Sequence, residues 1–444
     1  MERVFTTPKK TDDGFSPMLS KTNSHIVAIL CVAIALVTSP SRAQDSPVVL
    51  QSATLETLDK GGQIKSGSII FHKGKITAVG ATVKTPETAK VISKAGKYIL
   101  PAIIDPYRVI RVGGRGAATT RLVRIGGRLF RVRSRGGAFS TSFMRVGDNV
   151  DPYDLTVRPW LRSGIANINL VSTGYGQSVI ARATPESKGT MLRGAGRLYT
   201  SVSNSPTTLD LLRRGLGKPA TSTTTKTATA KTSTTKTSST TRSATSRTTS
   251  SSKTTSPSAQ LWADVKDGKA PIIVNVNSPA AVIHLMKVLE PHPKVKVVMV
   301  TAGATIYETM DLLKKRQGTL TLVLSPSIVT VPNTFNRFSP AKLAAQAKIP
   351  FALSMSLNEA NLRAQQGVPF FALALNVRAG VSRTLALEAV TKRPAEILGL
   401  EKSLGTLAVG KAATLLVFSG DPLDPLSRLE QVYLDGSIVY DATR

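Results

Sequence analysis

The 444-residue sequence predicts an α/β protein, and three observations lead to this fold class. Behind an apolar leader, both ends of the chain consist of short strand-like runs separated by turns. The middle alternates near-continuous apolar runs with amphipathic segments, as expected of buried parallel strands joined by helices. The length exceeds that of one ordinary core, so we expect two domains or one large barrel with an accessory module.

The amino terminus has the pattern of an export signal. Lysines precede the apolar run Ile26–Val37, and the small residues Ser41 and Ala43 follow it. The run is too short to span a bilayer comfortably. We predict a signal peptide over residues 1–43, no transmembrane span after its cleavage, and an exported protein that is periplasmic or secreted. An uncleaved anchor is the alternative. Cys31 lies in this leader, so the mature chain has no disulfide and no thiol nucleophile.

Strand signals cluster at both ends of the mature chain. Near its start, "SGSIIFHKGKITAVG" places strands Ile69–His72 and Ile76–Val79 on either side of a "KGK" turn. Near its end, apolar runs lead to a "DG" turn at Asp435 and Gly436, and the strand Ser437–Tyr440 follows. Both ends are therefore expected to form β-structure.

The middle of the chain contains longer apolar runs that fit strands buried on both faces. These predicted strands are Ile165–Ser172, Arg197–Asn204, Pro271–Asn277, Val295–Gly303, Thr319–Pro326 and Ile349–Ser356. Amphipathic helices fit between them, such as Pro279–Glu290 and Ile306–Gln317. With a strand that begins at Tyr98, this makes seven predicted strands.

These segments resemble the amidohydrolase family of metal-dependent hydrolases, especially imidazolonepropionase-like and related cyclic amidohydrolases. The resemblance rests on "GSIIFHKGKITAVG", "KYILPAIID", "AVTKRPAEILGLEKSLGTLAVGKAATLLVFSGDPLD" and "VYLDGSIVYD". It implies a small composite β-sandwich from residues 47–98 and 404–444, and a degenerate (β/α)8 TIM-like barrel over residues 99–403. In such barrels the chemistry lies at the carboxyl ends of the strands.

The sequence departs from this family at the metal ligands. Active members hold one or two divalent cations with a His-x-His pair after the first strand, a carboxylated Lys or a Glu, two later His residues and an Asp on the last strand. After Asp105, the paired positions hold Tyr107 and Val109. The later His positions fall near Asn275 and Thr301. We therefore predict no metal site and no other cofactor.

The position of the last-strand Asp falls near Ser356, with Ser354 as the nearest alternative. Polar side chains thus stand where the family has its ligands. They could line a pocket inherited from an active ancestor, which would bind a ligand rather than cleave it. The candidate pocket consists of Asp105, Tyr107, Asn275, Thr301, Ser354 and Ser356.

No catalytic residue can be assigned from the sequence. The histidines lie in separate segments, at His25, His72, His284 and His292. A zinc-like site needs about three or more convergent donors, and a hard cation wants roughly six. The sequence has no G-x-S-x-G motif, and its hydroxyl-rich strand ends have no nearby base.

The chain has a net charge of +31, and two insertions account for much of it. Residues 108–145 contain ten arginines and no acidic residue, and "RLVRIGGRLFRVR" within them fits a hairpin with a "GG" turn. One face of this hairpin would hold Arg124, Arg131 and Arg133, which suit carboxylates or phosphates. These three form a candidate anion-binding site. A solvated or salt-bridged basic flap is the alternative.

The second insertion is the Thr/Ser/Lys segment of residues 218–258. Its composition cannot bury enough apolar surface to fold, so we predict a disordered loop. Its cations suit an anionic polymer of the cell envelope, and a plain spacer is the alternative. Nucleic acid is not an expected partner, because the arginine-rich insertion between residues 108 and 145 is poor in aromatic residues and export separates the protein from most nucleic acid.

Together these observations predict an exported amidohydrolase-like protein without metal-dependent hydrolase activity, which binds a small or anionic ligand or serves as a scaffold. Two alternatives stay open. One is a hydrolase of carbon–nitrogen (non-peptide) bonds of cyclic amides with an unconventional site. The other is an envelope-associated polyanion-binding protein. The sequence does not identify the ligand or the oligomeric state.

Overall fold

The structure is a computed structural model. It describes residues 46–110, 120–125, 128–133, 142–150, 159–184, 191–203, 205–217, 257–331, 333–357 and 369–443. The predicted signal peptide, Cys31 and almost all of the Thr/Ser/Lys loop lie outside these ranges, as do the side chains of the arginine-rich hairpin. Within the described ranges, no helix is both long and apolar enough to cross a membrane.

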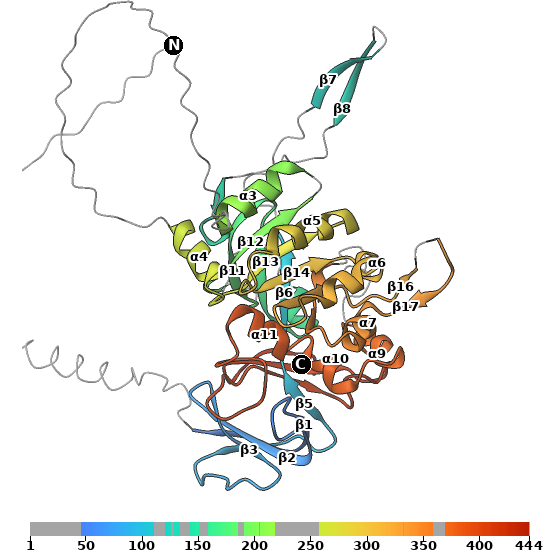
Figure 1. The fold of residues 1–444 in the computed structure, drawn as a ribbon. Helices are drawn as coiled ribbons and strands as arrows, with labels where there is room; N and C mark the ends of the chain where they lie inside the picture. The colour runs from blue at the N-terminus through green and yellow to red at the C-terminus, as the bar shows by residue number, and fades with distance from the viewer. Residues whose placement is uncertain are drawn as a thin grey trace, which may run out of the picture. The chain divides into compact units, whose positions relative to one another are not determined.

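Strands from both ends of the chain form one mixed eight-stranded sheet (Figure 1). They are β1 (Val48–Glu56), β2 (Gln63–His72), β3 (Lys75–Gly80), β4 (Lys90–Ser93), β5 (Tyr98–Pro101), β19 (Leu415–Phe418), β20 (Leu429–Leu434) and β21 (Ser437–Asp441). The two chain ends meet where β5 pairs antiparallel with β19. The predicted composite module is therefore present. Its strands form a single hydrogen-bonded sheet, and a bridge between Lys75 and Ala412 links β3 to the segment before β19.

The turns of this module follow the predicted sequence signals. Lys73 and Gly74, between β2 and β3, have φ of 48° and 79°, and Asp435 and Gly436, between β20 and β21, have φ of 45° and 78°. Two successive residues with positive φ are typical of a type I′ turn, whose twist suits a tight hairpin. The "KGK" and "DG" sequences thus fix the register of both hairpins.

A second, nine-stranded sheet forms the barrel. Its strands are β6 (Ile103–Val109), β9 (Phe143–Arg145), β10 (Ile165–Val171), β11 (Tyr175–Arg182), β12 (Met191–Val202), β13 (Ile272–Val276), β14 (Val297–Thr301), β15 (Leu320–Leu324) and β18 (Phe351–Leu353). The order is β18-β15-β14-β13-β12-β11-β10-β6, with β9 paired to β11. All neighbours are parallel except β11, which is antiparallel to β10 and β12. This is the predicted degenerate barrel.

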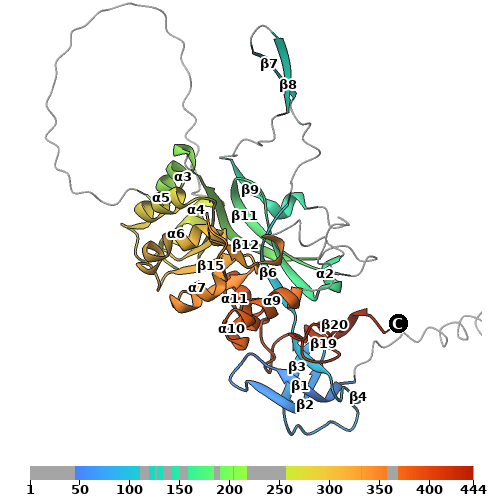
Figure 2. The ribbon, with the colours of Figure 1, turned by 90° about the vertical axis from the view of Figure 1, so that its right-hand side faces the viewer.

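Helices connect the parallel strands. They are α2 (Pro159–Arg162), α3 (Pro206–Leu216), α4 (Pro257–Lys266), α5 (Pro279–Leu289), α6 (Gly303–Lys314), α7 (Pro340–Gln346), α9 (Pro369–Arg378), α10 (Arg383–Glu388) and α11 (Lys392–Leu398). Helices α3 to α6 lie along one outer side of the sheet (Figure 2). The two helices predicted in the middle correspond to α5 and α6. Helix α5 begins after Ser278, whose Oγ accepts a hydrogen bond from the backbone N of Ala281 at 3.2 Å.

Two features differ from the sequence prediction. The single strand expected from Tyr98 is two strands, β5 in the module and β6 in the barrel. The chain changes partner between them: the N–H of Ala102 still bonds to Thr414, next to β19, whereas that of Ile103 bonds to Gly164, next to β10. Strand β11 is not predicted by any apolar run. It contains Gly176, where an added Cβ would lie 2.0 Å from the carbonyl O of Met144 in β9. The close approach of β9 explains this glycine inside a strand.

The arginine-rich insertion contains the predicted hairpin, formed by β7 (Thr120–Ile125) and β8 (Arg128–Arg133). Its register pairs Leu122 with Arg131 and Arg124 with Leu129, so these four positions share one face of the two-stranded sheet. The predicted face of the hairpin agrees with this register, whereas the predicted "GG" turn lies outside the described residues.

Candidate functional site

Asp105 lies in β6, the first barrel strand, and is 1% exposed. Its Oδ2 accepts hydrogen bonds from Oγ and N of Ser356, at 2.6 Å and 3.0 Å. Its Oδ1 is 2.7 Å from Oγ of Ser354 and accepts a bond from N of Tyr107 at 3.2 Å. We call this set, made of Asp105, Ser354, Ser356 and the backbone of Tyr107, the Asp105 cluster.

The hydrogens of the Asp105 cluster can be counted. Ser354 is fully buried, and its Oγ lies 2.7 Å from Asp105 Oδ1 and 2.8 Å from the carbonyl O of Tyr107. A serine hydroxyl has one hydrogen, so it cannot donate to both oxygens. Every polar atom is satisfied if Asp105 carries a proton on Oδ1 and donates it to Ser354, which then donates to Tyr107. The geometry favours a neutral carboxyl group.

The electrostatic environment favours the same form. Burial raises the pKa of Asp105, although the hydrogen bonds from Ser356, Ser354 and the Tyr107 backbone and the charge of Arg108 act in the opposite direction. Removing a carboxylate from water is expensive, so burial favours the protonated form. Asp105 is therefore suited to hold two strands together as a neutral hydrogen-bonding group.

A second group of polar side chains lies near this cluster. Burial raises the pKa of the Tyr107 hydroxyl, Tyr199 raises it further, and a hydrogen bond with the Asn275 side chain lowers it. Tyr107 and Tyr199 are 4% and 2% exposed, whereas Asn275 is partly exposed. Burial also raises the pKa of Tyr199. The Ser172 backbone lowers it, but this contact lacks hydrogen-bond geometry, and the hydroxyl has no such partner among the described residues.

The structure separates Thr301 from the rest of the candidate pocket. Asn275 pairs with Val300 in the next strand, while Thr301 pairs with Val276. Because successive residues of a strand point to opposite faces, Thr301 and Asn275 lie on opposite faces of the sheet. Thr301 therefore does not line the same pocket wall as Asn275.

Tyr199 is a residue that the sequence analysis did not select. It lies in β12, where its neighbour in β13 is Ile273, two residues before Asn275. Tyr199 and Asn275 therefore belong to the same face. The alternation of the predicted strand could have placed Tyr199 there, had the register between β12 and β13 been known.

The residues at this end of the barrel do not fit a divalent cation of the kind that the resembling family holds. Both oxygens of Asp105 already face hydroxyl or amide groups, which suit a carboxyl oxygen and not a positive ion. In the parts of the chain that the structure describes, no three His, Cys, Asp or Glu side chains come together as a metal site would require. His72 lies in β2, His284 in α5 and His292 in the following loop.

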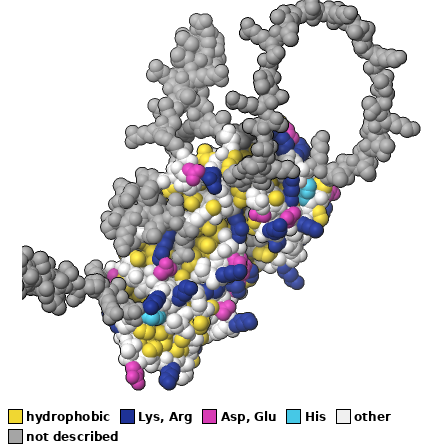
Figure 3. Space-filling model, turned by 90° about the vertical axis from the view of Figure 1, so that its left-hand side faces the viewer, with side chains coloured by type: hydrophobic (Ala, Val, Ile, Leu, Met, Phe, Trp, Pro, Cys, Tyr) yellow, Lys and Arg dark blue, Asp and Glu magenta, His cyan; other side chains and the backbone are white. Residues whose placement is uncertain are grey.

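Some of the basic side chains make contacts within the protein. Arg108, the first arginine of the insertion, places its guanidinium carbon 4.2 Å from the ring centroid of Trp160. Elsewhere, Lys and Arg side chains are spread over the face that Figure 3 shows, with acidic side chains among them. The side chains of Arg124, Arg131 and Arg133 lie outside the described residues.

Comparisons with known proteins point to one family. Residues 374–440 match the model of the Amidohydrolase family. The structure is similar to that of an amidohydrolase from Thermotoga maritima MSB8, with a TM-score of 0.62 and 17% identity over 89% of this chain and 100% of the other. No curated protein sequence matches the chain.

Two further structures share less of the fold. Dihydropyrimidinase from Brevibacillus agri NCHU1002 gives a TM-score of 0.47 with 12% identity, over 90% of this chain and 96% of the other. Beta-aspartyl dipeptidase from Fervidobacterium islandicum AW-1 gives 0.44 with 14% identity, over 89% and 97%.

Proposed function

Since the chain is an amidohydrolase-like protein in its fold and in its carboxyl-terminal sequence, we propose that it has kept the barrel of that family and uses it for binding or as a scaffold, without metal-dependent hydrolysis. The observation that supports this proposal is the Asp105 cluster. The first-strand and last-strand positions, which the resemblance expects to share a cation, are joined here by direct hydrogen bonds. The carboxyl group then serves to close the barrel.

The proposed ligand is small and polar. Tyr107 and Tyr199 offer phenol groups close to Asn275, which reaches the surface, so a ligand at this end of the barrel would be held by neutral hydrogen bonds. Such groups orient a bound molecule. They include no base or nucleophile with a pKa near neutrality.

Metal binding tests this proposal. The mature chain would be dialysed against zinc or manganese, its bound metal measured, and hydrolysis of a panel of cyclic amides followed. We expect no stoichiometric metal and no turnover. One or two bound ions per chain, lost in Asp105→Asn but kept in the exposed control Asp148→Asn, would overturn it. Turnover without metal, lost in Ser356→Ala, would instead favour an unconventional hydrolase.

We also propose, as a second function, binding of an anionic polymer outside the cytoplasm. The hairpin register supports it, since Arg124 and Arg131 occupy one face and Arg133 lies two residues beyond Arg131 on the same strand. Binding of heparin should fall steeply with salt and be lost on replacing these three arginines with Gln. Replacing Arg213, Arg214 and Arg378 instead is the matched control. Salt-insensitive binding would count against this function.

A further inference from the structure

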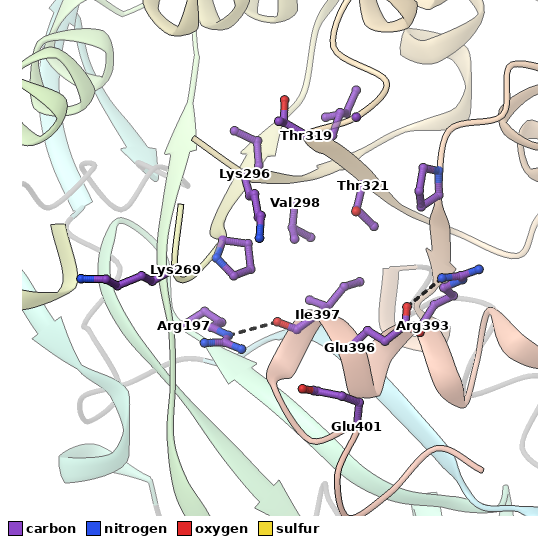
Figure 4. Close-up of a pocket in the computed structure, with 15 residues that line it drawn as sticks. Arg197, Lys269, Lys296, Val298, Thr319, Thr321, Arg393, Glu396, Ile397 and Glu401 are labelled. Carbon is purple, nitrogen blue, oxygen red and sulfur yellow. Dashed lines mark hydrogen bonds and ion pairs between the residues drawn. The ribbon is translucent and has the colours of Figure 1, made fainter. Parts of the chain in front are cut away.

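A cavity of about 340 Å³ opens at the end of the barrel opposite the Asp105 cluster. Its wall includes the residues that precede four parallel strands: Pro271, Lys296, Thr319 and Pro350. Helix α11 and the segment after it form the other side (Figure 4). The cavity therefore lies at the amino-terminal ends of the strands, away from the face where barrels of this type carry their chemistry.

The backbone around the cavity is fixed by bonds between strands. The N–H of Ile272 donates to O of Lys296 at 3.0 Å, and that of Val297 donates to O of Thr319 at 2.8 Å. The N–H of Leu322 donates to O of Pro350 at 2.9 Å. Side chains that start from these positions are held on rigid supports, which lowers the entropy cost of binding a ligand.

Four cations and two carboxylates line the cavity, and several are already paired. Arg393 bonds to Glu396 at 2.8 Å and lies 3.6 Å from Glu388. Lys269 bonds to Asp267 at 2.7 Å and extends away from the cavity (Figure 4). These pairs neutralise one another, so the electrostatic character of the cavity depends on the remaining charged groups.

The remaining groups are Arg197, Lys296 and Glu401. Arg197 is half-buried, and its Nε donates to the carbonyl O of Ile397 at 3.1 Å, which leaves the other nitrogens of the guanidinium directed elsewhere. Lys296 extends into the middle of the cavity (Figure 4) and forms no ion pair with the described residues. Burial lowers the pKa of Arg197, and Glu401 raises it. Two cations thus face one exposed carboxylate.

We propose that this cavity is a binding site for a small molecule with an oxyanion group, a phosphate or a carboxylate, held between Arg197 and Lys296. Arginine offers paired donors in a fixed geometry, and lysine adds a mobile positive charge. Thr319 and Thr321 also line the space. Glu401 competes with the ligand for Arg197. The site does not rest on the proposed function, because a catalytic or a non-catalytic barrel could contain it.

Binding of inorganic phosphate and of acetate to the mature full chain tests the site at low ionic strength by calorimetry. Lys296→Gln should weaken binding about tenfold. Lys294→Gln is the matched control, because Lys294 is exposed two residues earlier and does not line the cavity, and it should leave binding unchanged. Binding of phosphate alone, or of acetate alone, would assign the ligand to that class.

A second variant should change the affinity for the anion in the opposite direction. Glu401→Gln removes the carboxylate beside Arg197 and should tighten binding about threefold. Glu290→Gln, at an exposed glutamate outside the cavity, should have no effect. Thermal unfolding of each variant checks that the fold is intact. The site is disproved if neither anion binds, if Lys294→Gln weakens binding as much as Lys296→Gln, or if Glu401→Gln weakens it.

Discussion

Ser354 and Asp105 are 249 positions apart in the chain, yet only 2.7 Å separates Oγ of the serine from Oδ1 of the aspartate. Asp105 belongs to the first barrel strand, and Ser354 follows the last. In the described sheet, β6 and β18 are the two terminal strands of the order and share no backbone ladder. Side chains therefore join the barrel where the backbone does not.

Replacing Asp105 should distinguish a neutral group from a charged one. Asp105→Asn keeps a donor toward Ser354 and an acceptor toward Ser356, but its amide nitrogen cannot accept the hydrogen bond from N of Tyr107. We therefore expect it to lower the free energy of unfolding by about 1.5 kcal/mol. Asp105→Ala removes all these bonds and leaves a cavity, at a cost of about 3 kcal/mol. Urea unfolding near neutral pH measures both. An equal loss in the two variants would contradict the assignment of a neutral carboxyl group that donates to Ser354.

The stability difference between the wild type and Asp105→Asn should depend on pH. Because the folded-state pKa of Asp105 is raised above 3.8, the folded chain holds the proton more tightly than the unfolded chain. Its contribution to stability is complete below 3.8 and is lost as pH rises through the raised pKa. The wild type should lose stability relative to the variant over this range. A wild type that gains stability relative to Asp105→Asn as pH rises would contradict a raised pKa of Asp105.

Arg383 should stabilise the junction of the barrel with the strand module. Its guanidinium bonds to Glu56 at 2.8 Å and to Asp421 at 2.7 Å, and the side chain of Glu56 is only 7% exposed. Arg383→Gln leaves that carboxylate buried without its cation and should cost about 3 kcal/mol. Arg213→Gln breaks an exposed pair and should cost less than about 0.5 kcal/mol. Thermal unfolding compares the stability of the two variants. Equal losses of stability would show that Arg383 does not stabilise the junction.

Gly176 should tolerate no side chain. An alanine there would place its Cβ 2.0 Å from the carbonyl O of Met144, so β9 or β11 would have to move. We expect Gly176→Ala to destabilise the protein by about 3 kcal/mol. Gly318→Ala is the control, because its Cβ would meet nothing within 4 Å. If denaturant unfolding gave the same midpoint for both variants, β9 would not pack as described.

The strands of the barrel could be predicted because they are continuous apolar runs. Six of the predicted strands are mutually parallel strands of the barrel sheet, and the seventh, from Tyr98, is divided between β5 of the module and β6 of the barrel. Strand β11 could not be predicted in the same way. Residues such as Gly176 and Gln177 interrupt its apolar pattern, and their place in a strand depends on β9, which is distant in sequence. Pairing between distant segments is information that local patterns lack.

The candidate site was predicted in part. The positions of Asp105, Ser354 and Ser356 follow from the strand ends, and the structure brings these three side chains together. Their proton arrangement and the orientation of Thr301 could not be predicted, because a shift of one residue in register exchanges the faces of a strand. The cavity around Lys296 was missed for another reason. It combines strand starts with a helix that lies far along the chain.

The insertion between β6 and β9 has a mechanical consequence. At the start of the insertion, β6 pairs with β10, and at its end, β9 pairs with β11. Both ends of the insertion are therefore anchored in the same sheet. A partner that holds the hairpin would transmit force to the barrel wall through two strands at once. The two ends of the insertion are thus fixed by strands that are not neighbours in the sheet order.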